Sequence, residues 1–224
     1  MKKLLGLIAL VAAAAAAHAA GAVQAVDSRL DNAKTVIGQI MSNTSNSIPR
    51  SLADKAQCVA VVPAMKKAAF IFGGSYGQGV ATCRTKSGWS GPVFIRMAGG
   101  SWGLQIGGQS TDLVLLAMNQ KGFQDLLHSK FKIGAGVAAT AGPVGRNAQA
   151  ATNATLHSEL LSYSRSKGAF VGIDLNGTTV TQNTDDTKSL YGSGKTFGQI
   201  LRGSAPVPTV AKPFLATVRR YFGG

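Results

Sequence analysis

Acidic residues are scarce in this 224-residue chain, which has 9 Asp and Glu against 23 Lys and Arg and a formal net charge of +14. Charged residues make up 14% of the sequence, well below the roughly 25% of ordinary soluble domains. The positive balance therefore comes from missing acids rather than from added bases. Glu159 is the only glutamate, which argues against long charged helices and coiled coils, because these are rich in Glu and Lys.

Proline and long apolar runs are scarce as well. The 7 prolines and 28 glycines follow no three-residue period, which excludes collagen. The hydrophobic content of 45% argues against a disordered chain. No stretch beyond the N-terminus is apolar over the roughly 20 residues that a bilayer-spanning helix needs. These absences leave a glycine-rich, basic globular domain.

The N-terminus has the pattern of a secretory signal peptide. A basic start, Met1-Lys2-Lys3, precedes an apolar run, Leu4–Ala17, and Ala17-His18-Ala19 supplies the small residues of a cleavage site. We expect residues 1–19 to be cleaved, with an uncleaved anchor as the alternative, and residues 20–224 to form a single domain. No Cys follows the apolar run, so a lipid-anchored lipoprotein is not expected. The sequence thus predicts an exported protein, periplasmic or secreted, that is soluble or held peripherally on a membrane.

The chain has two cysteines, Cys58 and Cys83. In an oxidising compartment two cysteines usually pair, and a bridge forms here if their strands are neighbours or face each other across the core. If instead strands at 58–62, 68–72 and 79–83 form a simple meander, the cysteines lie two strands apart and stay as buried free thiols. No second Cys or His lies at ligand spacing, so no metal site is expected.

Hydrophobic periodicity changes along the chain from a helical to a strand pattern. Apolar residues recur every three or four positions from Val26 to Ile40, which predicts an amphipathic helix over 26–41. From Cys58 the period becomes two, which is typical of strands. A helix over 112–118 is predicted because Ser110 or Thr111 can cap it and Asp112 lies in its first turn. Further helices are predicted at 48–56, 120–129, 195–201 and 210–222, and strands at 58–62, 68–73, 78–84, 92–98, 101–109, 131–141, 156–164 and 170–175.

This order of elements predicts an α+β fold. We expect a single domain with a mostly antiparallel, glycine-rich β-sheet or partial barrel, flanked by helices at both termini. Asn176-Gly177 predicts a tight turn within it.

Three motifs resemble catalytic sequences but lack their structural context. Residues 73–77 and 99–103 fit G-x-S-x-G, the nucleophile elbow of serine hydrolases, but strand patterns follow both serines where the elbow needs a helix. We interpret both segments as glycine hairpin turns or bulges. Gly194-Lys195-Thr196 resembles the end of a phosphate-binding loop, but Ser189 stands where that motif needs glycine. Asp185-Asp186 lies in a polar loop, solvent-facing or a weak cation site, so neither catalysis nor a cofactor is expected.

Several basic residues are predicted in turns, where an anion can reach them. Gly142-Pro143-Val144-Gly145-Arg146 can present backbone N–H groups and a guanidinium to a phosphate or sulfate. The alternative is a tight turn with an exposed Arg. Lys66-Lys67 and Lys130-Phe131-Lys132 are further basic turn positions, or ordinary solvated charges.

Several motifs occur in an order that is more specific than any one of them. They are Ala56–Pro63, Phe70–Gly79, Gly88–Pro92, Gly99–Gly107, Ser110–Val114, Gly142–Arg146 and Leu161–Gly168. In this order they resemble the SYLF-domain family, also called the yeast-type actin-binding domain family, over roughly residues 27–222. The resemblance implies lipid binding. Eukaryotic members bind phosphoinositide-containing membranes, partly through an N-terminal amphipathic helix that corresponds here to Val26–Met41, and some bind actin filaments, whereas bacterial members are exported proteins thought to bind phospholipids.

The sequence therefore predicts a non-enzymatic bacterial envelope protein that binds anionic, phosphoinositide-like phospholipid membrane surfaces. Its charge supports this, because each basic residue near an anionic surface contributes roughly 1 kcal/mol. The residues expected to bind lipid head groups are Arg29, Lys34, Lys66, Lys67, Lys130, Lys132 and Arg146. The alternative is an envelope structural or adhesion protein that binds a partner protein or another polyanion, with actin-type binding by family analogy alone. Nucleic acid is not expected, because export removes the usual target and no groove-reading motif is present.

Overall fold

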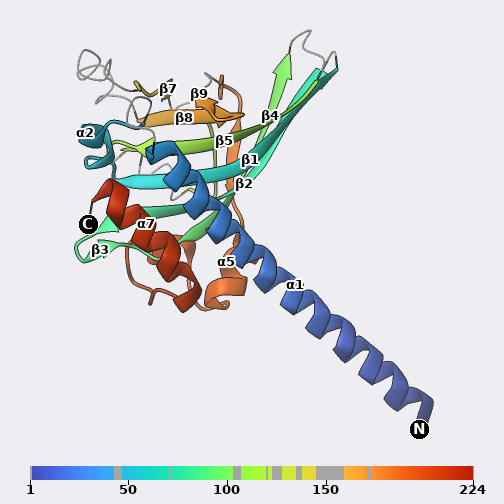
Figure 1. Cartoon of the computed structure of the whole chain (residues 1–224). Coiled ribbons are helices and arrows are strands. Elements are labelled where there is room, and N and C mark those ends of the chain that lie inside the picture. The colour runs from blue at the N-terminus through green and yellow to red at the C-terminus, as the bar shows by residue number, and fades with distance from the viewer. Residues whose placement is uncertain are drawn as a thin grey trace.

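The protein is built around one curled β-sheet, seen in a computed structural model (Figure 1). The structure describes residues 2–42, 47–70, 72–102, 107–119, 121–122, 128–134, 138–144, 159–170 and 173–223. The long central strands are β1 (Cys58–Phe70), β2 (Phe72–Thr85), β4 (Val93–Trp102) and β5 (Gly107–Ala117). The shorter ones are β3 (Gly88–Trp89), β6 (Lys130–Lys132), β7 (Ala139–Ala141), β8 (Leu160–Ser166), β9 (Ala169–Phe170) and β10 (Thr179–Gln182).

The described strands follow the order β6-β10-β4-β2-β1-β5-β8-β7, with β3 beside β2 and β9 beside β8. Their pairings are antiparallel except that of β7 with β8. The helices are α1 (Lys2–Met41), α2 (Arg50–Ala53), α5 (Thr184–Tyr191), α6 (Phe197–Leu201) and α7 (Lys212–Phe222), and a 3-10 turn, η2 (Thr209–Ala211), precedes α7. The predicted α+β class, with helices at both ends of a mostly antiparallel partial barrel, is confirmed.

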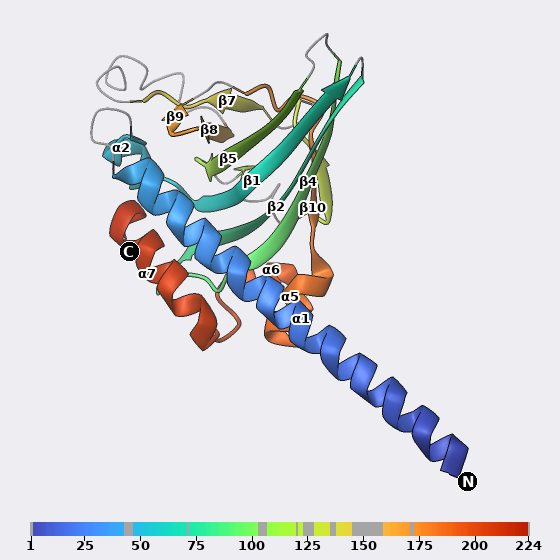
Figure 2. The ribbon, with the colours of Figure 1, turned by 45° about the vertical axis from the view of Figure 1, so that its right-hand side comes forward.

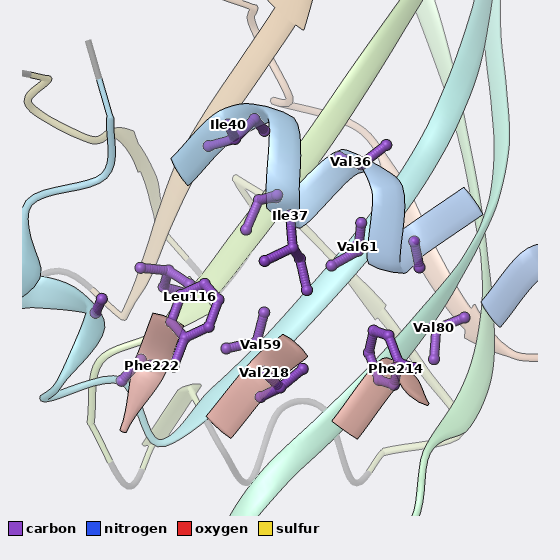
Figure 3. Close-up of a cluster of buried hydrophobic side chains, with 14 of the residues drawn as sticks. Val36, Ile37, Ile40, Val59, Val61, Val80, Leu116, Phe214, Val218 and Phe222 are labelled. Atoms are coloured by element: carbon purple, nitrogen blue, oxygen red, sulfur yellow. The ribbon is translucent and has the colours of Figure 1, made fainter. Parts of the chain in front are cut away.

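Two apolar layers hold the sheet, one on each face. On the first face, Val59 and Val61 of β1 pack beneath α1 and α7, which lie side by side across the strands (Figure 3). The apolar spacing of α1 explains this position, because Ile37 and its neighbours at three- and four-residue steps form one stripe. We call this face the α1 face. The opposite face lines the inside of the curl and packs against α6, while the first turns of α1 extend away from the sheet (Figure 2).

The prediction of a helix over 112–118 is wrong, because Asp112–Ala117 belongs to β5. This strand lies in the sheet between β1 and β8. Leu113–Ala117 is buried on both faces, so its apolar residues run continuously instead of alternating, and such a run cannot be distinguished from a helix by periodicity.

The strands predicted at 58–62 and 68–73 are one strand, β1, which continues through a bulge after Val62. Lys66-Lys67 therefore lies within a strand and not in a turn. The two G-x-S-x-G segments are not hairpin turns either. Their described residues, 73–77 and 99–102, lie in β2 and β4, with Gly74 paired to Gly100, and β2 continues as a strand after Ser75.

Other elements of the second half are placed differently from the prediction. The strand expected over 131–141 is in fact two strands at opposite edges of the sheet. β6 pairs with β10 at one edge, and β7 pairs with β8 at the other. The strand expected over 170–175 ends at Phe170 with β9, and β10 and α5 were not predicted. The helix predicted over 120–129 and the first residues of the strand predicted at 156–164 lie largely outside the described residues. The turn at Asn176-Gly177 and the helices at 48–56, 195–201 and 210–222 are confirmed within a few residues.

A disulfide joins Cys58 to Cys83. The two cysteines are directly opposite each other in the β1–β2 ladder, because merging the two predicted strands into β1 makes their strands neighbours. The pairing alternative is thus confirmed, and the covalent link closes a long segment at the end of the sheet covered by the helices.

The C-terminal end of α7 is fixed by side chains from β2 and β3. Arg84 donates to the carbonyl oxygens of Phe222 and Gly223, and also to Ala56 O at 2.8 Å and Asp54 O at 2.9 Å. Trp89 Nε1 donates to Gly223 O at 2.6 Å. Since the last carbonyl groups of a helix lack partners within it, these bonds attach α7 to the sheet. Burial lowers the pKa of Arg84, and the charge of Asp54 opposes this shift.

Candidate functional site

An open, polar groove separates α1 from the β1–β2 hairpin. Its volume is about 520 Å³, and polar residues of α1 line one side of it while strand residues line the other. The strand side includes Lys66, Tyr76, Gln78 and Asp112. The groove arises because the apolar stripe of α1 is packed on the sheet, and an adjacent polar flank of the helix faces the distal half of the strands.

Arg29 occupies the floor of this groove and binds protein groups. It donates to the carboxylate of Asp186 in α5 and to the side-chain oxygen of Gln78, and its guanidinium lies 5.6 Å from the centroid of the Phe94 ring. Only 14% of the Arg29 side chain and 18% of the Asp186 side chain are exposed. Asn183, the N-cap of α5, also donates to Asp186. Arg29 therefore ties α1 to α5 and to β2.

Asp112 anchors the other end of the groove. It accepts a hydrogen bond of 2.9 Å from the backbone N of Ala64, whose φ of 48° marks the bulge of β1. Its carboxylate also lies 3.7 Å from Arg165 of β8, and Arg165 donates to Gln39 of α1. Asp112 thus holds the shape of β1 at the point where the strand leaves the core and extends past α1.

Three exposed lysines share the α1 face beyond this point. Strand pairing places Lys132, Thr179, Ala98, Tyr76 and Lys66 opposite one another across five neighbouring strands. Directly paired residues point to the same side of a sheet, so Lys66 and Lys132 lie on one face. Lys130, two residues from Lys132 in β6, lies on that face as well. We call Lys66, Lys130 and Lys132 the lysine row.

The acids near the lysine row are paired with arginines. Asp186 binds Arg29, and Asp185 lies 3.4 Å from Arg96 of β4. Asp112 is next to Arg165. These three pairs are neutral in sum, so the three lysines supply the excess positive charge on this part of the α1 face.

Two further basic residues of the predicted site, Lys67 and Lys34, do not join the row. Lys67 is half-buried and, as the neighbour of Lys66 in a strand, points to the opposite face. Lys34 pairs with Asp31 at 2.7 Å and lies about 140° around α1 from Arg29. Arg146 lies outside the described residues.

The segment before Arg146 lines a second, smaller pocket of about 230 Å³ at the β7–β8 edge. Gly142 lies so close to Tyr163 that an added Cβ would be 2.1 Å from the ring. Burial raises the pKa of Tyr163, whose hydroxyl has no hydrogen-bond partner among the described residues. The described residues that line this pocket are mostly apolar.

The structure places the hydrolase-like serine of β2 in an ordinary strand. Ser75 Oγ donates to Gly99 O at 3.4 Å. Asp185-Asp186 begins α5, capped by Asn183, and is not a loop. In the described parts of the chain, no group of three or more His, Cys, Asp or Glu lies close enough to hold a metal.

Sequence reasoning missed three groups that shape the site: Asp112, Asp186 and Tyr76. The spacing Asn183-x-x-Asp186 is a capping pattern that predicts the start of a helix, and it was available in the sequence. Asp112 and Tyr76 acquire their roles only through strand pairing, which the sequence did not show. Across the described residues, no helix combines the length and apolar character needed to cross a bilayer.

Comparison with known proteins matches residues 98–221 to a family model, Ysc84, described as "Las17-binding protein actin regulator". The chain is 34% identical over 172 residues to Protein YSC84 of Saccharomyces cerevisiae. The aligned region covers 75% of this chain and 36% of that relative. It is 26% identical over 167 residues to SH3 domain-containing YSC84-like protein 1 of Homo sapiens, covering 74% of this chain and 48% of that relative. The chain thus spans less than half the length of these two relatives.

Proposed function

Because this chain belongs to the Ysc84 family of Las17-binding actin regulators, we propose that it is a non-enzymatic binding domain whose ligand is the surface of an anionic phospholipid membrane. Family membership supports a binding role. The lipid ligand is our inference from the charges on the α1 face.

The lysine row carries this proposal. Lys66, Lys130 and Lys132 are exposed on one face, and the acids beside them are engaged by arginines. A face of this kind attracts a phosphate-bearing surface, because the charges of these three acids are balanced by their arginines. At roughly 1 kcal/mol for each base near an anionic bilayer, three lysines contribute about 3 kcal/mol, or on the order of a hundredfold in affinity.

The distribution of acids along the chain supports the same surface. No Asp or Glu occurs between Asp54 and Asp112, a stretch with six Lys and Arg. This stretch folds into β1, β2, β3 and β4, together with the start of β5. The scarcity of acids noted in the whole chain is therefore concentrated in the hairpins that extend beyond the helices.

Vesicle co-sedimentation tests the proposal. We expect the chain to bind vesicles of phosphatidylcholine and phosphatidylglycerol more tightly than pure phosphatidylcholine, and to release them as salt is raised, because salt screens exposed charges. The variant Lys66→Glu/Lys130→Glu/Lys132→Glu should lose at least tenfold in affinity. A matched variant, Lys86→Glu/Lys195→Glu/Lys212→Glu, changes three other exposed lysines by the same charge. Equal losses in the two variants, or equal binding to neutral vesicles, would contradict a site on the lysine row.

A partner protein is the second candidate ligand, because the matching family is described by its binding of Las17. An acidic segment of a protein would use the same lysines, and the relatives extend well beyond the part that matches this chain. Competition separates the two ligands: a protein partner should still bind in the presence of excess anionic vesicles if it uses another surface, and be displaced if it uses the lysine row.

We also propose that the protein works outside the cytoplasm, in a bacterial periplasm or beyond. The Cys58–Cys83 disulfide supports this, because disulfides persist in oxidising compartments, and so does the signal-like N-terminus. Mass spectrometry of the expressed protein should find a chain that begins at residue 20. An intact N-terminus with both thiols free would refute it.

A further inference from the structure

A small pocket of about 270 Å³ lies between α5 and α6. Lys188 in the second half of α5 and Lys195 just before α6 line it, together with Thr184, Thr196 and Phe197. Both lysines are exposed, and within the described residues neither forms an ion pair. The residues that line the pocket include no Asp or Glu, so their charge is positive. We call this hollow the α5–α6 pocket.

Helix α5 keeps its own acids on other sides. Successive helical residues are turned by about 100°, so Thr184 and Lys188 share one side of α5 and Asp186 lies on the opposite side. Asp186 pairs with α1, against which α5 packs (Figure 2), and Asp185 pairs with β4. The acids of α5 are therefore engaged elsewhere, and the helix presents a base and a hydroxyl group to the pocket.

The connection from α5 to α6 is fixed at both ends. At the end of α5, the hydroxyl of Tyr191 donates to Pro92 O at 2.9 Å. At the start of α6, Thr196 forms a capping box with Gln199. Residues 192–195 are held between these two anchors, so the pocket is formed before any ligand arrives, as is usual for small-molecule sites.

Hydroxyl groups supply further donors near the two lysines. Thr196 Oγ1 accepts from Gln199 N at 3.2 Å, which leaves the hydrogen of this hydroxyl free to donate. Thr184 and Ser193 also line the pocket and are exposed. Phe197, which is 6% exposed, adds an apolar wall. Ammonium and hydroxyl donors suit phosphate oxygens, and the apolar wall suits a carbon skeleton attached to them.

The sequence carries a related signal in Gly194-Lys195-Thr196, which resembles the end of a phosphate-binding loop. The structure has no such loop here, because Ser189 lies inside α5 and donates to Asp185 O at 3.0 Å. Lys195 instead lines a pocket with Lys188. Side chains from two helices and their connection thus provide the donors that a loop backbone provides in that motif.

We propose that the α5–α6 pocket binds a soluble phosphomonoester of a small organic molecule, with Lys188 and Lys195 on the phosphate and Phe197 beside the carbon skeleton. A phosphomonoester carries close to two negative charges at neutral pH, which matches two ammonium groups. The volume of the pocket is below that of sites for drug-sized ligands, so the ligand is small. No residue of the lysine row lines this pocket, and the inference is therefore independent of the proposed membrane binding.

Isothermal titration of the full chain with glycerol 3-phosphate tests the pocket. We expect a dissociation constant of about 1 mM or below, and no binding of glycerol, which lacks the phosphate. Lys188→Gln/Lys195→Gln should weaken binding about tenfold or more, because both charge-assisted hydrogen bonds are lost. Lys86→Gln/Lys212→Gln is the matched control, since it removes two exposed lysines elsewhere, and it should change the affinity less than about twofold.

Three results would overturn the proposal. They are no binding of glycerol 3-phosphate up to about 10 mM, equal weakening in the two double variants, and equally tight binding of inorganic phosphate, which would show a site for an inorganic ion only. Vesicle sedimentation distinguishes a soluble ester from a lipid head group. Lys188→Gln/Lys195→Gln should sediment with phosphatidylglycerol vesicles as the unchanged chain does, and Lys66→Glu/Lys130→Glu/Lys132→Glu should still bind glycerol 3-phosphate. Loss of vesicle binding in the pocket variant would assign the pocket to lipid and overturn the soluble ligand.

Discussion

Single acidic residues in this chain serve as structural partners of bases and backbone groups. Asp186 holds Arg29, and Asp112 holds the bulge of β1 through Ala64 N. Glu159 accepts hydrogen bonds from Lys121 and, at 2.9 Å, from the backbone N of Ala138. The bond from Lys121 is the main cause of the lowered pKa of Glu159. A carboxyl with a lowered pKa stabilises the fold above its unfolded-state pKa, and this contribution is lost as the pH falls through the folded-state value.

Replacing Arg29 should destabilise the protein and leave its membrane affinity unchanged. Arg29→Ala removes the counter-charge of the largely buried Asp186, so we expect the free energy of unfolding in urea to fall by about 2–3 kcal/mol. Arg29→Ala/Asp186→Ala should recover part of that loss. Lys34→Ala is the control, because its exposed pair with Asp31 contributes at most about 0.5 kcal/mol. Weaker vesicle binding by Arg29→Ala at unchanged stability would show instead that Arg29 contacts lipid.

The basic residues show what the sequence can predict about single side chains. It predicted that Lys66, Lys130 and Lys132 are accessible to an anion, because lysine side chains are usually exposed to solvent. It could not separate Lys66 from Lys67, since the face that each takes depends on a bulge held by Asp112, 48 residues further along the chain. Arg29 was assigned to head groups for a similar reason: its partner Asp186 is 157 residues away.

Elements that pack on one side followed from the sequence, and elements buried on both sides did not. The apolar stripe of α1 and the apolar face of α7 were predicted because each helix has one exposed side and one buried side. β5 was mistaken for a helix because Leu113–Ala117 is buried on both faces. Lys66 and Lys67 suggested a turn because β1 leaves the core there, and solvent reaches both faces of the strand.

The junction of α7 with the sheet depends on one guanidinium. Arg84 bonds four carbonyl groups from two segments and lies 4.7 Å from the Trp89 ring centroid. Arg84→Ala leaves these carbonyls without their donor, so we expect the free energy of unfolding to fall by about 2–4 kcal/mol. Arg84→Lys should recover only part of it, because an ammonium cannot reproduce the fork of donors.

Thermal and urea unfolding of Arg84→Ala check this expectation. The exposed Arg202→Ala serves as its control and should change stability by less than about 0.5 kcal/mol. If Arg84→Ala unfolds at the wild-type midpoint, the contacts of Trp89 and the apolar face of α7 suffice to hold the helix.

At the scale of the molecule, stability and binding are divided between the two ends of the sheet. The disulfide, the helices and the bonds of Arg84 lie at the end that holds the core. The long strands then carry lysines and small residues away from it. Substitutions at the far end should therefore alter binding with little effect on folding. The effect of a single added charge on membrane affinity can be measured there.

Gly100 offers a site for that measurement. It lies in β4 between Ala98 and Trp102, on the α1 face, and an added Cβ would meet no atom within 4 Å. Gly100→Glu should weaken binding to anionic vesicles about fivefold and Gly100→Lys should strengthen it about fivefold, since one charge near the bilayer is worth roughly 1 kcal/mol. Gly194, equally open in the turn between α5 and α6, provides the same pair of substitutions away from the lysine row and should give equal affinities. Raising the salt to about 0.5 M should bring the two Gly100 variants together, because screening then acts within a few Å. If they differ as little at low salt as the Gly194 pair, the far end of the sheet does not approach the membrane.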